Sequence, residues 1–199
     1  MPSPLILASA SPIRAELLRR AAVAVEIRPA RLDEEALRAS LQAEGAGPRD
    51  LADTLAEHKA RKVSQRAPQA LVLGCDQILD LDGTVFSKPA DRAAARAQLQ
   101  RLRGHTHRLH AAAVLCRAGA PLWRHVGVAH LTMRNFSDAY LDAYLDRGWP
   151  AVGDSVGAYR LEDEGVRLFS RIDGSHFTVL GLPLLELLVH LGRIGEIEA

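Results

Sequence analysis

The sequence has little cysteine, almost no net charge and no long hydrophobic run. Its two cysteines, Cys75 and Cys116, form neither a CxxC pair nor a metal-spaced set, so a disulfide framework is not expected. We expect both thiols in the core. Lys and Arg total 25 against 24 Asp and Glu, a net charge of +1, so no overall field attracts nucleic acid or an anionic membrane. No stretch approaches the ~20 apolar residues that span a bilayer.

The first apolar run, Leu5 to Ala8, is shorter than the hydrophobic region of a signal peptide, and its basic residues follow it. We therefore expect a cytoplasmic protein with no membrane partner and no nucleic-acid partner. A chain of 199 residues with 48% hydrophobic content can build one sizeable core, or two lobes that share a sheet. No internal repeat or low-complexity tail interrupts it.

The N-terminal stretch predicts a strand, a short turn and a helix. Leu5 to Ala8 has the length of a buried strand, and Pro12 suits the first position of a helix capped by Ser11. Arg14 stands where the helix dipole disfavours a cation by roughly 0.3–1 kcal/mol. A bound anion would reverse that preference, so Ser9, Ser11 and Arg14 indicate a phosphate site. A capped helix with a solvent-facing arginine is the alternative.

A second stretch places a carboxylate beside a buried strand. The apolar run from Leu71 ends in Gly-Cys-Asp, which puts Asp76 at the carboxyl end of a strand, where ligands bind in open α/β sheets. The chain continues as strand from Gln77 to Leu81, with Asp82-Gly83 as a hairpin turn, so we expect Asp76 in a bend of extended chain. A turn-forming role for Asp76 is the alternative.

Three further charged residues stand in distinctive positions. Lys59 lies near the apolar stripe of a helix predicted over 48–66, so it either snorkels to solvent or points into a cleft. Lys88 precedes Pro89 and is held extended. Glu34 belongs to an acidic cluster at a helix start, where acids also serve simply to complement the dipole.

The remaining pattern predicts an α/β protein, and it gives little support to a metal site built from histidines. His105 and His107 fall on one face of a predicted strand and His110 on the other, without an evident carboxylate, which disfavours zinc. The pattern predicts helices over 91–102, 137–145 and 184–191, strands over 104–116, 123–133, 160–161 and 166–172, and a loop over 153–159.

Together these positions form a set suited to a polyphosphate with a divalent metal. Cations would neutralise phosphate oxygens, and carboxylates would hold Mg²⁺ or activate water. No Cys–His pair or G-x-S-x-G motif competes for the role of nucleophile. The set comprises two serines, three cations and two carboxylates: Ser9, Ser11, Arg14, Glu34, Lys59, Asp76 and Lys88.

With these motifs the sequence resembles the Maf proteins, nucleoside triphosphate pyrophosphatases that cleave between the α and β phosphates. The resemblance covers nearly the whole chain, and the order and spacing of its motifs are specific. The motifs are Leu7 to Arg14, Leu32-Asp33-Glu34, Ala56 to Ala60, Gly74 to Gln77, Ser87-Lys88-Pro89, Gly104 to His107, Gly157-Ala158-Tyr159, Gly174 and Gly181 to Leu184.

The resemblance implies one Maf-like α/β domain over 1–199, with a long mixed twisted sheet flanked by helices and a cleft between two lobes, the Maf/ITPase-like arrangement. It also implies a homodimer, a nucleoside triphosphate substrate and Mg²⁺ or another divalent cation such as Mn²⁺. Carried onto this chain, it makes Asp76 the general base or a metal ligand and Glu34 a second metal ligand. Lys59 and Lys88 would clamp the triphosphate, with Lys88 counted as catalytic, and Ser9, Ser11, Arg14 and Gln77 would bind substrate.

Two departures bear on the substrate. Ile13 replaces the first of two arginines common in the family, and Gln77 stands where the dTTP- and UTP-cleaving branch tends to have threonine. The stretch 154–157 also lacks a lysine often seen there. These features favour the branch that acts on 7-methyl-GTP and other modified nucleotides. A catalytically weak, nucleotide-binding regulator of cell division and septum formation is one alternative; a phosphatase that releases orthophosphate is another.

Overall fold

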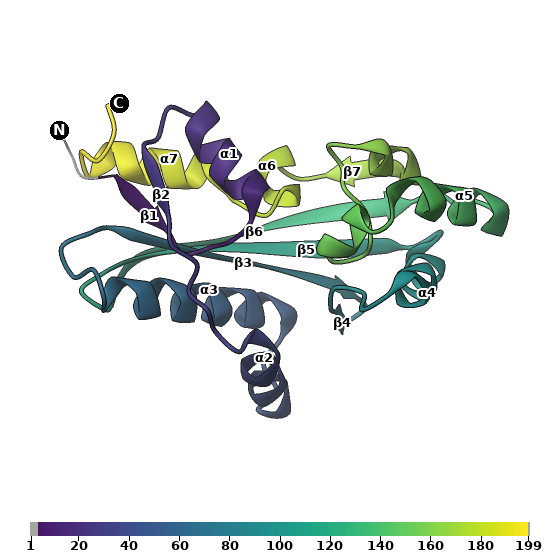
Figure 1. The fold of residues 1–199 in the computed structure, drawn as a ribbon, viewed down its shortest axis with the longest axis horizontal. Coiled ribbons are helices and arrows are strands. Elements are labelled where there is room, and N and C mark those ends of the chain that lie inside the picture. The colour runs from purple at the N-terminus through teal and green to yellow at the C-terminus, as the bar shows by residue number, and fades with distance from the viewer. Residues whose placement is uncertain (1–3, 199) are drawn as a thin grey trace. The chain divides into compact units, whose positions relative to one another are not determined.

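The computed structural model describes residues 4–198 and shows a mixed α/β fold (Figure 1). Its described strands form a seven-stranded sheet in the order β2-β1-β3-β5-β6-β7, with β4 paired to β3. β1 is parallel to both β2 and β3, whereas the β3–β4 and β6–β7 pairs are antiparallel, so the expected long mixed sheet is confirmed. The strands are β1 (Leu5–Leu7), β2 (Val25–Ile27), β3 (Val72–Leu81), β4 (Thr84–Phe86), β5 (Thr106–Arg117), β6 (Ala120–Met133) and β7 (Phe169–Asp173).

Most helices begin where the sequence placed a capping residue. Asp33, Asp91 and Ser137 each accept a hydrogen bond from a first-turn amide. Ser11 is the N-cap residue of the first helix, but its side chain makes no cap bond. The helices are α1 (Pro12–Arg20), α2 (Glu34–Ala43), α3 (Pro48–Ser64), α4 (Arg92–Leu102), α5 (Asp138–Gly148), α6 (His176–Val179) and α7 (Leu184–Arg193), with 3-10 turns η1 (Ala151–Asp154) and η2 (Glu164–Leu168).

The stretch between α5 and β7 differs from its prediction. Residues 160–161 are not a strand, and residues 166–168 belong to η2, so β7 begins only at Phe169. The reason is a close approach of the backbone to itself, because a Cβ built on Gly165 would lie 2.3 Å from the carbonyl oxygen of Arg160. That contact requires a compact turn, which an alternating strand pattern does not reveal.

The chain divides into two compact units. The first comprises residues 1–77, 110–127 and 175–199, and the second comprises residues 78–109 and 128–174. β3, β5 and β6 contribute residues to both units. None of the helices in residues 4–198 is long and apolar enough to cross a membrane.

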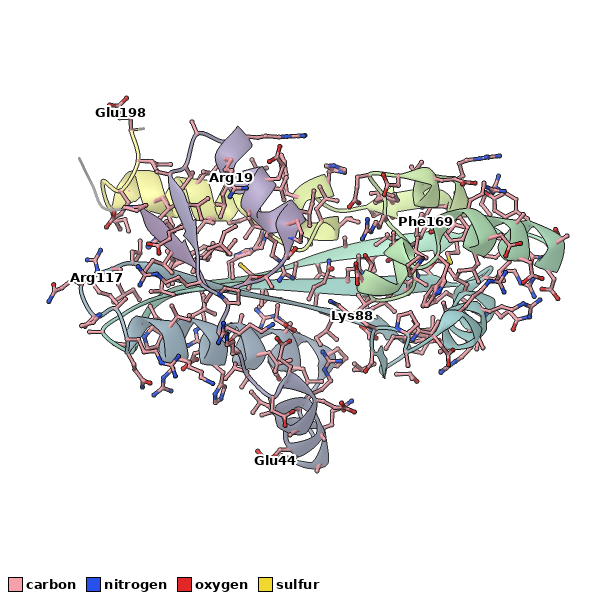
Figure 2. All side chains as sticks on the ribbon, in the orientation of Figure 1. Arg19, Glu44, Lys88, Arg117, Phe169 and Glu198 are labelled. Carbon is pink, nitrogen blue, oxygen red and sulfur yellow. The ribbon has the colours of Figure 1, made fainter. Side chains whose placement is uncertain are left out.

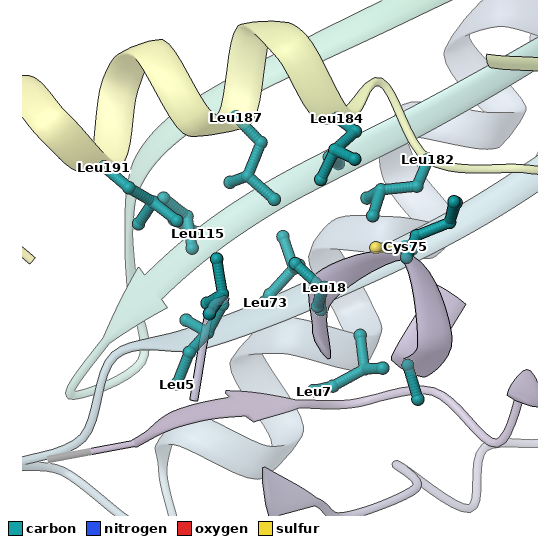
Figure 3. Packing of buried hydrophobic residues seen from close by; sticks show 14 of the residues in the cluster. Leu5, Leu7, Leu18, Leu73, Cys75, Leu115, Leu182, Leu184, Leu187 and Leu191 are labelled. Atoms are coloured by element: carbon teal, nitrogen blue, oxygen red, sulfur yellow. The ribbon is translucent and has the colours of Figure 1, made fainter. Parts of the chain in front are cut away.

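In the first unit, helices cover both faces of the sheet (Figure 1). Leucines of α1 and α7 pack against those of β1, β3 and β5 on one face, as Figure 3 shows for Leu187 above Leu73. The other face is covered by α3, whose Val63 packs with Ile6 and Val72. Both cysteines are buried and free, as expected. Burial of these apolar side chains, at about 25 cal/mol per Å², holds the strands on which the polar residues lie.

In the second unit, α4 and α5 are in contact and are joined by ion pairs. Arg96 pairs with Asp142 at 2.7 Å, and Arg103 pairs with Asp138 at 2.6 Å. The predicted Asp82-Gly83 turn joins β3 to β4, with φ of 50° and 84°. Two consecutive positive φ angles match the twist of a tight hairpin.

Candidate active site

A glycine in β3 brings α3 unusually close to the strand. A Cβ built on Gly74 would lie 2.1 Å from the carbonyl oxygen of Ala56 and 2.7 Å from the amide nitrogen of Ala60. Only glycine therefore fits where the helix backbone touches the strand. Because alternate strand residues share a face, Asp76 points to the same side as Gly74, toward α3.

Lys59 of α3 meets two carboxylates at this approach. Its Nζ lies 2.7 Å from Oδ1 of Asp76 and 2.8 Å from Oε2 of Glu34. Lys59 is 7% exposed and Asp76 4%, whereas the Glu34 side chain remains 45% exposed. Of the two predicted orientations of Lys59, the structure shows the one that points inward. Two of its three ammonium protons are used, and the third is left for another acceptor.

Asp76 lies in the interior of β3, not at the end of a strand or in a bend as the sequence indicated. The predicted continuation of the strand from Gln77 to Leu81 is confirmed, and pairing with β4 keeps this part of β3 extended. The Oδ2 atom of Asp76 is buried and has no hydrogen-bond partner within residues 4–198. A buried carboxylate oxygen without a partner is costly unless a donor or a cation meets it in the working site.

The carboxylates of Asp76 and Glu34 fit a magnesium ion bound with few protein ligands. Mg²⁺ is commonly held by one or two carboxylates, with phosphate and water oxygens completing its shell. No cluster of three or more His, Cys, Asp or Glu side chains suited to a metal occurs in the described part of the chain. The residues therefore suit a metal that arrives with a phosphate ligand better than a permanently caged ion.

Arg14 is anchored on the opposite side of β3, where the pairing with β1 ends. The amides of Ile6 and Ala8 donate to the carbonyls of Leu71 and Leu73. The chain then turns into α1, and Nη1 of Arg14 donates to the next carbonyl in that row, Cys75, at 3.3 Å. Arg14 thus donates to the carbonyl that β1, which has already ended, no longer reaches. This contact explains a cation in the first turn of α1.

The other donors of Arg14 fix its direction. Its Nε donates to the carbonyl of Gly181 at 2.7 Å, and its Nη1 also donates to Oγ of Ser9 at 3.2 Å. Ser9 Oγ in turn accepts the amide of Ser11. The alternative of a solvent-facing arginine is wrong. Nη2 has no acceptor in the part of the chain that the structure describes, so one face of the guanidinium remains available to an anion.

Gln77 is bound to the same segment as Arg14. Its Nε2 donates to the carbonyls of Thr178 and Val179 at 3.1 and 2.9 Å. Gly181, with φ of 89°, passes so close that a Cβ there would meet Nη2 of Arg14 at 3.0 Å. These bonds join the strand, the first helix and the turn before α7 into one polar cluster. Sequence reasoning missed the part of Thr178 and Val179, because backbone acceptors carry no residue-type signal.

Lys88 belongs to the second unit, where it follows β4 and is exposed (Figure 2). Within residues 4–198 its ammonium group has no carboxylate partner, so its charge is available to a ligand. The other predicted site residues all lie in the first unit. The part of Lys88 in the site stays a prediction.

The neighbouring thiol is not a nucleophile. Burial raises the pKa of Cys75 to about 11, although the charges of Arg14 and Lys59 oppose that rise. A thiol with so high a pKa is almost entirely protonated near neutral pH and reacts slowly. Cys75 is therefore not a candidate nucleophile.

Residues 4–194 match the family described as Maf-like protein, so the chain belongs to the Maf family. The resemblance read from the motifs is thereby confirmed. Among its relatives, the nucleoside triphosphate pyrophosphatase of Roseobacter denitrificans is 58% identical over 197 residues, 99% of each chain. The 7-methyl-GTP pyrophosphatase of Mesorhizobium japonicum is 50% identical over 198 residues, 100% of each chain. These names agree with the expected class, an enzyme that hydrolyses phosphoric anhydrides.

A solved structure of a HAM1 protein from Coxiella burnetii aligns with a TM-score of 0.44 and 17% identity, covering 67% of this chain and 74% of that one.

Proposed function

We propose that this Maf-family protein is a nucleoside triphosphate pyrophosphatase that hydrolyses the α–β phosphate bond of a non-standard or modified nucleotide. The products would be a nucleoside monophosphate and pyrophosphate. The observation that carries the proposal is the Lys59–Asp76–Glu34 cluster, in which one buried carboxylate oxygen has no partner within residues 4–198. The names of the relatives support the same reaction.

The proposed chemistry uses the two oxygens of Asp76 differently. Oδ1 is held by Lys59, which fixes the carboxylate in direction, and Oδ2 is the atom that takes a proton from the attacking water. Asp76 and Glu34 would hold Mg²⁺, or Mn²⁺, which when bound would supply positive charge for the phosphate oxygens. The Lys59 ammonium group would donate its third hydrogen bond to a phosphate oxygen as negative charge develops there.

Arg14 and Lys88 would supply further positive charge. The free Nη2 of Arg14 would bind a phosphate oxygen beside Ser9 and Ser11, while its other nitrogens keep the guanidinium in place. Lys88 would clamp the triphosphate from its extended position before Pro89. A clamp of this kind lowers the entropic part of the activation barrier, because the bound phosphates are already oriented for attack by water.

A 7-methylguanine nucleotide is the favoured substrate of this proposal, on the grounds of Gln77 and of relatives named 7-methyl-GTP pyrophosphatase. Gln77 holds the Thr178 and Val179 carbonyls, whereas a threonine side chain at that position is too short to reach both. dTTP and UTP are the competing substrates. The cytoplasmic location, the homodimer and a single domain with a cleft between its lobes stay predictions.

The test is a panel of canonical and modified nucleoside triphosphates with Mg²⁺, in which pyrophosphate and orthophosphate are measured separately. We expect pyrophosphate from one or a few nucleotides, with 7-methyl-GTP first among them. Orthophosphate as the product would identify a phosphatase instead. Nucleotide binding without release of either product would favour the regulator of cell division.

A further inference from the structure

The helix that carries Glu34 has no hydrophobic anchor of its own. None of the ten residues of α2 is buried, and in Figure 1 the helix extends beyond α3 on the side away from the sheet. Glu44, at its C-cap, is exposed (Figure 2). Apolar packing near Glu34 comes from Leu32, which lies two residues earlier and packs, partly buried, against the core. Polar contacts at the start of the helix therefore share in placing Glu34.

Two lysines of α3 supply those contacts. Lys59 donates to the Glu34 carboxylate at 2.8 Å, and Lys62 donates to the backbone carbonyl of Arg31 at 2.8 Å. The two lysines are three residues apart, so they project from the same side of α3, about one turn from each other. The points they hold, Arg31 and Glu34, are also three residues apart. The segment is thus held at two places by a matched pair of cations.

The carbonyl that Lys62 holds belongs to a strained turn. Arg31 has a φ of 50°, a conformation that a residue with a side chain adopts only where its surroundings impose it. Before the turn, Ala30 is buried beside Val63, the residue that follows Lys62. After it, Asp33 accepts the Ala36 amide at 3.0 Å and starts α2. The turn at Arg31 therefore sets the direction in which Glu34 leaves the core.

We propose that Lys62 is a positioning residue for Glu34, which acts through the Arg31 carbonyl and touches neither substrate nor metal. The proposal rests on the metal-binding role of Glu34 given above. Lys62 keeps the turn in place, so that the Glu34 carboxylate stays within reach of Lys59 and Asp76 even though its own helix is not packed into the core. Residues of this kind, which orient a metal ligand from behind, typically contribute 10–100-fold to metal affinity or activity.

The kinetic test compares Lys62→Met with Arg66→Met. Arg66 is an exposed cation just beyond α3 whose side chain makes no hydrogen bond or ion pair within residues 4–198, so its replacement removes the same charge without the contact. We expect Lys62→Met to lower kcat about tenfold and to raise the half-saturating Mg²⁺ concentration about tenfold, with KM for nucleotide changing much less. Arg66→Met should match the parent protein, and Lys62→Arg should restore most of the activity.

A double-mutant cycle separates positioning from a direct role. In a Glu34→Gln background, Lys62→Met should cause almost no further loss, because the ligand that it positions is already gone. Losses that multiply in the double variant would overturn the proposal. So would a full loss of activity in Lys62→Arg, because arginine can still donate to the Arg31 carbonyl.

An independent measurement is the hydrogen exchange of the Ala36 and Leu37 amides, which bond to Asp33. Lys62→Met should speed their exchange, while the amides of β3 and the melting temperature stay as in Arg66→Met. Unchanged exchange would overturn the proposal whatever the activity. Faster exchange in a protein that releases no pyrophosphate from any nucleotide would instead retain the positioning role and refute the proposed reaction.

Discussion

Lys59 and Asp76 form a buried ion pair, 2.7 Å between Nζ and Oδ1, across the contact of α3 with β3. The two residues are 17 positions apart in sequence. Neither charge is well solvated, because the side chains are 8% and 6% exposed. Each carboxylate or ammonium depends on its partner for stabilisation, and the pair therefore links the stability of the fold to the chemistry of the site.

The first prediction concerns removal of the cation. Lys59→Met should lower the free energy of unfolding by about 3 kcal/mol, because Asp76 would remain buried and charged without a partner. Urea denaturation measures this loss. The double variant Lys59→Met, Asp76→Leu should recover most of the stability, since no buried charge is left unpaired. A double variant as unstable as the single one would show that packing, and not charge, explains the effect.

Replacement of the base should separate binding from turnover. Asp76→Asn should abolish pyrophosphate release while nucleotide affinity stays within about tenfold, because an amide cannot accept the proton but keeps the shape of the side chain. Single-turnover kinetics and equilibrium titration with nucleotide measure the two quantities. A variant that keeps more than about a tenth of the parent rate would remove Asp76 from the role of general base.

The close approach of α3 to β3 should make one glycine irreplaceable. Gly74→Ala would place a methyl group 2.1 Å from the Ala56 carbonyl oxygen, and two backbones have little freedom to move apart. We expect a loss of about 3 kcal/mol or more in thermal or urea denaturation. Gly47 is the matched control, since a Cβ built there would meet nothing described within 4 Å, and Gly47→Ala should cost less than about 1 kcal/mol.

Lys88→Ala tests the predicted clamp. The side chain is exposed, so its removal should leave the melting temperature unchanged while it raises KM and lowers kcat together. Lys88→Arg should retain part of the activity, because the positive charge is kept. An unchanged KM in Lys88→Ala would place this residue outside the phosphate site.

The loss of folding stability at acidic pH should depend in part on His107, a fully buried residue of the second unit. Burial lowers the pKa of His107 to about 4 from 6.5, while the charge of Asp80 opposes the shift. As pH falls from about 6.5 to 4, the unfolded chain therefore binds a proton that the native protein excludes. His107 therefore contributes up to about 3 kcal/mol to the free energy of unfolding. This contribution is fully present above pH 6.5 and is lost as the pH falls toward 4.

The control for that prediction is His107→Gln. Glutamine does not titrate and can still bond to the Tyr159 hydroxyl, which lies 2.8 Å from Nε2 of His107. Unfolding by urea at several pH values should show a shallower loss of stability below pH 6.5 in the variant. If the free energy of unfolding falls equally with pH in both proteins, other groups cause the loss of stability in acid.

Some candidate site residues could be singled out from the sequence because they occupy positions that local rules disfavour. Arg14 in a first helical turn pointed to an anion, whereas Lys59 near an apolar stripe left solvent and a cleft as alternatives. Both side chains prove to be engaged in polar contacts. The strand end or bend predicted at Asp76 was wrong, although the continuation of the strand over 77–81 was predicted correctly. An apolar run that stops at Gly-Cys-Asp looks locally like the end of a strand. The strand predicted over 160–161 was wrong because only the close approach of Gly165 to the Arg160 backbone forbids it, and that contact leaves no local signal.

Residue types and their order along the chain were enough to predict the α/β class and most helix starts. They also singled out a set of side chains whose binding of phosphate and metal stays a prediction. These features follow from capping, periodicity and charge, which act over a few residues. Tertiary packing decided the rest. It joined Lys59 to both carboxylates, left one oxygen of Asp76 without a partner among the described residues, and set Arg14 on the carbonyls of Cys75 and Gly181, because contacts between distant segments depend on how closely backbones approach.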